Sequence, residues 1–192
     1  MPPRATNSVR VILIPPITAS SGQLLLRSTP GDTKREADDR GSLESGVARD
    51  PLAVIELGAA SDWGLNGGGS SFGPAAAVEL TAIKNWLVIE TGVGTLFQHG
   101  QTEWDTDIVF KKPFDLSPTV EFEPGIGPVW IHTISGGRNA DAIGAEFVAD
   151  FMFWLTPDRK FGWFLEPSYT YSFGPGHQQS FGMSAGLLIP IN

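Results

Sequence analysis

Acidic residues recur in this chain in one arrangement, in which a carboxylate is followed two and four positions later by small residues. The four copies are Glu56-Leu57-Gly58-Ala59-Ala60, Glu90-Thr91-Gly92-Val93-Gly94, Glu123-Pro124-Gly125-Ile126-Gly127 and, more loosely, Glu166-Pro167-Ser168-Tyr169-Thr170. In a β-strand this spacing places the carboxylate and both small residues on one face. Carboxylates gathered in this way attract cations, so the function depends on which face of the strands lies inside.

The strands that would carry these residues are predicted by an alternation of apolar and polar residues. We expect eight of them: Leu52–Trp63, Pro74–Ala82, Trp86–Phe97, Glu103–Lys112, Thr119–Thr133, Ala142–Leu155, Phe161–Ser172 and Ser180–Ile191. The connections are too short for parallel crossovers, which need about a dozen residues or more. The pattern therefore predicts an all-β fold, an eight-stranded antiparallel up-and-down transmembrane β-barrel.

The connections are expected to differ in length at the two ends of this barrel. The stretch between Trp63 and Pro74 is long and rich in glycine, whereas the turn at Thr156–Lys160 is compact. Because alternate connections of a meander lie at the same end, longer loops should gather mostly at one end. That asymmetry is typical of outer-membrane barrels.

The two faces of the predicted strands carry different side chains. One face is apolar and includes Leu57, Ile126 and Phe147. The other face interleaves small residues with one base, Lys111, and with the acids Glu56, Glu79, Glu90, Asp107, Glu123, Glu146, Asp150 and Glu166. We expect these eight acids to form an acidic belt at a middle level of the lumen, with Lys111 as the lumen base.

Two barrels fit this alternation. A soluble lipocalin-like barrel would bury the apolar face and bind an apolar ligand, and a membrane barrel would turn that face toward lipid. Eight strands enclose a space only just filled by side chains, which suits the small residues better than the bulky apolar face. A solvated outer face would also mix Lys and Arg with the acids. The membrane barrel is therefore favoured, and the soluble barrel stays as the alternative.

Aromatic residues are expected at both ends of the strands. Amphipathic rings gather at the two membrane interfaces of transmembrane barrels. We expect six tryptophans to belong to two such girdles, with Trp63, Trp104 and Trp130 in one and Trp86, Trp154 and Trp163 in the other.

Several stretches resemble a known family. The meander, the Gly-x-Gly strand centres, Glu103-Trp104-Asp105-Thr106-Asp107 and Trp163-Phe164-Leu165-Glu166-Pro167-Ser168-Tyr169 resemble the small outer-membrane β-barrel proteins of Gram-negative bacteria, notably uncharacterised porin-like proteobacterial members. The resemblance covers about residues 52–191. It implies a barrel in the bacterial outer membrane, surrounded by lipid bilayer and lipopolysaccharide and inserted by the outer-membrane assembly machinery. We expect a monomer.

Composition narrows the remaining choices. The net charge of −8 argues against nucleic-acid binding, and the absence of cysteine excludes disulfides and thiolate metal sites. Residues 28–50 contain almost no large apolar side chains, so we expect residues 1–50 to be a disordered or leader segment and residues 51–192 to form the barrel.

These observations predict a structural, porin-like or surface-interaction role with an acidic lumen and no cofactor or metal. A cation pathway and a lumen filled by hydrogen-bonded side chains both remain open. An enzyme is not expected, and a lipid-modifying enzyme is the weaker alternative. Its candidate groups would be His132, Ser135 and Asp141, which cluster around one loop.

Overall fold

The computed structural model describes residues 51–191. Residues 1–50, expected to be a leader or disordered segment, lie outside the described residues, as does Asn192. The strands are β1 (Ala53–Gly64), β2 (Gly69–Ile83), β3 (Leu87–Gln98), β4 (Gln101–Lys111), β5 (Phe114–Ser117), β6 (Val120–Ser135), β7 (Arg138–Trp154), β8 (Gly162–Ser172) and β9 (Gln179–Ile191). Among these residues no helix is long and apolar enough to cross a membrane.

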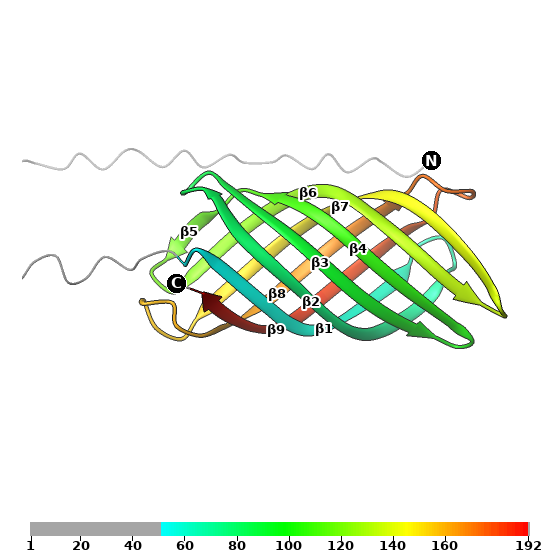
Figure 1. Ribbon diagram of the computed structural model, residues 1–192, viewed down its shortest axis with the longest axis horizontal. Helices are drawn as coiled ribbons and strands as arrows, with labels where there is room; N and C mark the ends of the chain where they lie inside the picture. The colour runs from blue at the N-terminus through cyan, green and yellow to red at the C-terminus, as the bar shows by residue number, and fades with distance from the viewer. Residues whose placement is uncertain (1–50, 192) are drawn as a thin grey trace, which may run out of the picture. The chain divides into compact units, whose positions relative to one another are not determined.

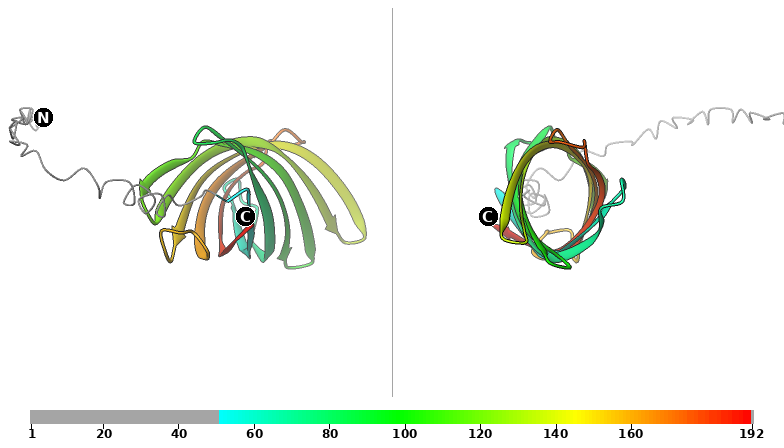
Figure 2. Two further views of the ribbon diagram at one scale, coloured as in Figure 1. Left: turned by 60° about the vertical axis from the view of Figure 1, so that its left-hand side comes forward. Right: turned by 90° about the vertical axis from the view of Figure 1, so that its right-hand side faces the viewer.

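Eight of these strands close into a single antiparallel ring. The closed barrel can be followed in Figures 1 and 2. The ring closes where β1 pairs with β9, from Ala53 opposite Ile191 to Gly64 opposite Ser180. The eight strands of the ring are called staves below. The short strand β5 is not one of them, because β4 pairs directly with β6 and β5 pairs only with the first residues of β6. The predicted fold class, an eight-stranded antiparallel barrel, is therefore confirmed.

The outer face of the barrel is apolar along the middle of the strands. Leu57, Val93, Ile126, Phe147 and Leu187 all lie on this face and are each 46–49% exposed. Leaving such side chains in water forfeits roughly 25 cal/mol per Å² of apolar area, whereas a bilayer covers them. The soluble lipocalin-like alternative is therefore wrong, because it requires these side chains to point inward.

The tryptophans occupy the two ends of this apolar face, with one exception. Trp63, Trp104 and Trp130 are exposed on the outer face toward one end, and Trp86 and Trp163 toward the other. We call the end where Ala53 and Ile191 meet the terminal end and the opposite end the distal end. Trp86 and Trp163 lie at the terminal end, and the other three lie at the distal end.

The assignment of Trp154 to a girdle was wrong. Trp154 is only 4% exposed and packs inside the barrel against Val54, Met152 and Phe164. Its neighbour Phe153 faces outward and stacks on Trp163, with ring centroids 4.0 Å apart. Consecutive residues of a strand point to opposite faces, so the outward position of Phe153 places Trp154 inside.

The expected difference in loop length was also wrong. The glycine-rich stretch after Trp63 forms a four-residue turn, residues 65–68, between long paired strands. Gly136 and Gly137 alone connect β6 to β7, with φ values of 56° and 78°. Two successive residues with positive φ match the right-handed twist of a hairpin. At these two connections, residues expected to form loops therefore extend the paired strands.

Candidate functional site: an acidic barrel lumen

All eight predicted lumen acids and Lys111 lie on the inner face. Glu56, Glu79, Glu90 and Glu123 are 2–3% exposed, Asp150 is 0% exposed and Lys111 is 1% exposed. Three further acids are less completely buried and line one inner cavity: Asp107, Glu146 and Glu166.

Lys111 lies at the centre of this group and contacts four carboxylates on four strands. Its Nζ is 3.0 Å from Glu79 Oε1 on β2, 3.2 Å from Asp150 Oδ2 on β7 and 2.9 Å from Glu166 Oε2 on β8. It also forms an ion pair with Glu90 on β3. Since β4 neighbours only β3 and β6 in the sheet, three of these ion pairs cross the lumen. Lys111 therefore ties opposite walls of the barrel together.

The acids do not share a single level, which corrects the expected belt. Asp107 lies opposite Gly92, two residues nearer the distal end than Glu90, and its Oδ1 accepts a hydrogen bond of 2.9 Å from the Gly92 amide. Glu146 lies four residues nearer the distal end than Asp150 on the same strand. The belt around Lys111 therefore contains Glu56, Glu79, Glu90, Glu123, Asp150 and Glu166, and the other two acids lie above it.

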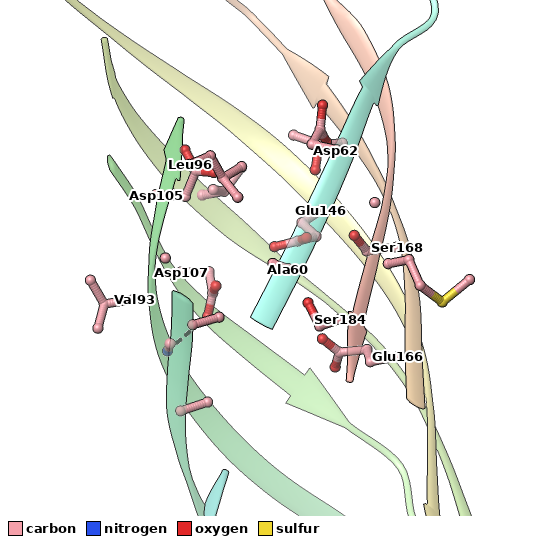
Figure 3. A pocket seen from close by; sticks show the side chains of 18 of the residues that line it. Ala60, Asp62, Val93, Leu96, Asp105, Asp107, Glu146, Glu166, Ser168 and Ser184 are labelled. Atoms are coloured by element: carbon pink, nitrogen blue, oxygen red, sulfur yellow. Dashed lines mark hydrogen bonds between the residues drawn. The ribbon is translucent and has the colours of Figure 1, made fainter. Parts of the chain in front are cut away.

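Above the belt, acids from several strands face a common space, as Figure 3 shows for Asp62, Asp105, Asp107 and Glu146, whereas Val93 points the other way. This cavity has a volume of about 110 Å³. It shares Asp62, Leu96, Glu103, Ile131, Thr170 and Ser180 with a wider vestibule of about 540 Å³ at the distal end. The inner cavity therefore adjoins the distal vestibule.

Four inward-facing acids were missing from the sequence analysis: Asp62, Glu103, Asp105 and Glu121. The alternation of inward and outward residues along each strand predicts that these acids face inward. Asp62 is in phase with Glu56 on β1, Asp105 is in phase with Asp107 on β4, and Glu121 is in phase with Glu123 on β6. Following the phase of each strand to its ends would have found all four.

The belt interrupts the lumen. A separate cavity of about 50 Å³ at the terminal end is lined by Glu79, Glu121, Glu123 and Trp154 and shares no lining residue with the inner cavity. Lys111, Met152 and Leu188 are fully buried inside the barrel, and Met152 also lines the terminal cavity. Barrels of eight strands have room for little more than their own side chains. In this structure the polar lumen is a plug rather than a continuous passage.

Arg159 closes the terminal mouth. It lies in the connection between β7 and β8, is 8% exposed and has a positive φ of 49°. Its guanidinium pairs with Asp115 and, at 3.1 Å, with Glu121, and it lies 6.0 Å from the ring of Trp154. This role was not predictable from the sequence, because a turn residue has no strand phase that would predict the direction of its side chain.

The candidate catalytic residues are only partly assembled. His132 Nδ1 is 2.7 Å from Asp141 Oδ1, near the distal end. His132 is on the outward-facing register of β6, as Trp130 beside it is, whereas Ser135 is on the inward-facing register. A nucleophile and its base must lie within hydrogen-bond reach of each other, so these three residues do not form a triad.

Two solved structures of bacterial surface proteins have a similar barrel. The barrel is similar to that of Neisserial surface protein A, with 16% sequence identity over 72% of this chain and 97% of that chain, and a TM-score of 0.61. It is also similar to Ail, the attachment invasion locus protein of Yersinia pestis, with 14% identity over 73% of this chain and 98% of that chain, and a TM-score of 0.52. The fold is that of a small outer-membrane β-barrel.

A second structure of Ail, in complex with the heparin analogue sucrose octasulfate, matches with 12% identity and a TM-score of 0.53, over 73% of this chain and 98% of that chain. No protein-family model and no curated protein sequence matches the chain. At these identities the likeness concerns the fold. It confirms the resemblance and the fold class predicted from the sequence, and it supports the predicted location in the bacterial outer membrane.

Proposed function

We propose that this protein is a non-conducting surface-interaction protein of the bacterial outer membrane, which binds cationic groups in its distal vestibule. The observation that carries the proposal is the pairing of a plugged lumen with an acidic cavity open only on the distal side. A plugged barrel cannot serve as a passage for solutes, so its function lies at an end of the barrel. The terminal end, where the chain enters and leaves the barrel, faces the periplasm in this proposal.

The charge of the vestibule defines its ligand class. The inward-facing acids Asp62 and Glu103 line it, and no Lys or Arg is among the described residues that do so. Polar groups such as Gln98, Gln101 and Thr133 complete the wall. Complementary charge steers association and rejects partners of like charge. The vestibule is therefore suited to amines and to Lys or Arg side chains of a partner.

The structural neighbours support a surface role without fixing the ligand. One is named as a surface protein and the other as an attachment invasion protein, and the latter has been solved with a heparin analogue. Sucrose octasulfate is a polyanion. An acidic vestibule repels such a molecule, so we propose the opposite charge preference for this chain.

Binding of a lysine-rich peptide to the full chain in lipid vesicles tests this proposal. We expect saturable binding that weakens with salt, because surface charge pairs are screened, and no binding of sucrose octasulfate. The double variant Asp62→Asn/Glu103→Gln should weaken peptide binding at least several-fold. The variant Lys84→Gln, at the terminal end, is the matched control for surface charge. Equal binding by the double variant, or preference for the polyanion, would contradict the proposal.

Planar-bilayer recording tests the absence of a pore separately. The wild-type barrel should show no stable open channel, because Lys111 and its partners fill the lumen. A steady, cation-selective conductance in the wild type would overturn this part of the proposal and favour the porin-like role. Peptide binding and conductance are independent readouts, so each part can fail alone.

The remaining features of the proposal concern the surroundings of the barrel. Every stave is paired on both sides within residues 51–191, which leaves no sheet edge for a second copy and supports a monomer. In this proposal lipopolysaccharide surrounds the distal girdle, the assembly machinery inserts the barrel, and the protein has no catalytic role.

A further inference from the structure

The belt around Lys111 has far more negative than positive groups. Six carboxylates, those of Glu56, Glu79, Glu90, Glu123, Asp150 and Glu166, surround a single ammonium group. Burying an ionised carboxylate is very costly unless it is paired. Lys111 alone offsets only one of these charges, so the remaining acids must be neutralised by a bound cation or by protons.

Three buried oxygen atoms of the belt have no hydrogen-bond partner and are not among those paired with Lys111: Glu56 Oε1, Glu123 Oε2 and Asp150 Oδ1. Glu56 is 2% exposed and Asp150 is 0% exposed. The second carboxylate oxygen of Asp150 is the one that contacts Lys111. An unsatisfied buried acceptor costs about 1–3 kcal/mol, and more when it is charged. These oxygens lack a positive ligand of their own.

The geometry around Glu56, Glu79 and Asp150 fits an oxygen-coordinated ion. One carboxylate oxygen from each of Glu56, Glu79 and Asp150 lies within 4.8 Å of the other two. Calcium binds oxygen ligands at about 2.3–2.6 Å, so two ligands on opposite sides of one ion lie about 4.8 Å apart. The three acids come from β1, β2 and β7, so such an ion would link the neighbouring strands β1 and β2 to β7 on the other side of the ring.

We propose that Glu56, Glu79 and Asp150 form a binding site for a hard divalent cation, calcium or magnesium, beside Lys111 in the lumen. The ion supplies the positive charge that Lys111 does not. The carboxylates provide the oxygen ligands that these ions prefer over nitrogen or sulfur. This site is distinct from the distal vestibule, and its occupancy does not depend on the proposed surface role.

An access path to the site leads from the distal end. Glu56 lines the inner cavity, and that cavity shares Asp62, Glu103 and Ser180 with the vestibule. The lining acids attract cations along this route, since a cleft lined by charge of one sign raises the local concentration of counter-ions. At the terminal end Glu79 lines the smaller cavity, which Arg159 also lines and where Arg159 pairs with Glu121.

The test uses the full chain refolded in detergent. The protein is loaded with calcium or magnesium, dialysed against metal-free buffer and analysed for bound metal by mass spectrometry. We expect close to one retained ion per barrel. Thermal unfolding, followed by circular dichroism and heat-modifiable gel migration, should shift to higher temperature with the ion and return with a chelator.

Isosteric variants separate this site from general acidity. Glu56→Gln keeps the side-chain shape and should lose the retained ion and the thermal shift. Glu146→Gln, another inner acid outside the three ligands, should keep both. Retention unchanged in Glu56→Gln, retention lost only in Glu146→Gln, or no retained ion with either metal would each overturn the proposal. Stability that responds to pH but to neither metal would assign the missing positive charge to protons instead.

Discussion

Lys111 is the residue on which the charge balance of the lumen most depends. Replacing it by Met removes the ammonium and leaves four partner carboxylates buried without it. Breaking a buried ion pair by removing one partner costs about 3–5 kcal/mol. We expect Lys111→Met to lower the free energy of unfolding by at least this amount, measured by denaturant titration of tryptophan fluorescence in detergent.

The adjacent lysine provides the control for this change. Lys112 is at the terminal end with its Nζ 5.4 Å from the ring of Phe114, and it donates a hydrogen bond to the Asn85 carbonyl. Lys112→Met should cost less than about 1 kcal/mol, as exposed charges usually do. Equal losses for the two variants would mean that the belt is neutralised without Lys111.

The sequence predicted the direction of Lys111 but not its contacts. Alternation along β4 places its side chain in the lumen, and no further knowledge is needed for that. Which carboxylates it meets depends on the stagger of strands across the ring, which no single strand encodes. The same holds for Glu56, Glu79 and Asp150, whose oxygens converge although they come from distant parts of the chain.

At the scale of the strands, the small residues that follow each carboxylate of the repeat have different neighbours in the different copies. A Cβ on Gly127 would overlap the backbone carbonyl of Ile108 on the neighbouring β4. A Cβ on Gly94, the corresponding position of another copy, would meet nothing within 4 Å. We expect Gly127→Ala to cost about 1–3 kcal/mol through overpacking, and Gly94→Ala to be nearly neutral.

Denaturant unfolding of both variants under the same conditions measures this difference. If the two substitutions cost the same, the close approach of β4 and β6 at Gly127 does not constrain the barrel. The comparison is clean because both glycines lie on the inner face and neither has a positive φ.

Strand positions were largely predictable, and their ends were not. Each predicted strand overlaps one stave, because a half-buried strand has a strict period of two. The error at Trp154 came from counting two consecutive aromatics as one girdle. The missing extensions at the distal end, such as residues 134–141, came from interpreting polar residues as loop, although paired strands beyond the apolar face are equally polar.

For the whole molecule, the apolar outer face predicts a depth-dependent response to charge. Val93 lies at the middle of β3 and points outward. Val93→Arg should destabilise the barrel in lipid by roughly 2–4 kcal/mol, because that is the cost of Arg near the bilayer midplane. Ile134→Arg, next to the distal end of β6, should cost only about 0–1 kcal/mol.

Reversible unfolding from lipid vesicles gives both values. A Val93→Arg variant as stable as Ile134→Arg would show that Val93 does not lie at the depth proposed for it. Repeating the pair in detergent micelles, which adapt more readily around a charge, should shrink the difference.

The opposed faces of the sheet also constrain how the barrel can be made. Until β1 meets β9, the inner carboxylates have no lumen, and an open sheet within the bilayer would expose them to hydrocarbon. Unpaired strand edges are equally unacceptable there. The β1–β9 seam joins the first and last strands of the ring. Closing that seam removes the last unpaired strand edges and encloses the inner carboxylates at the same time.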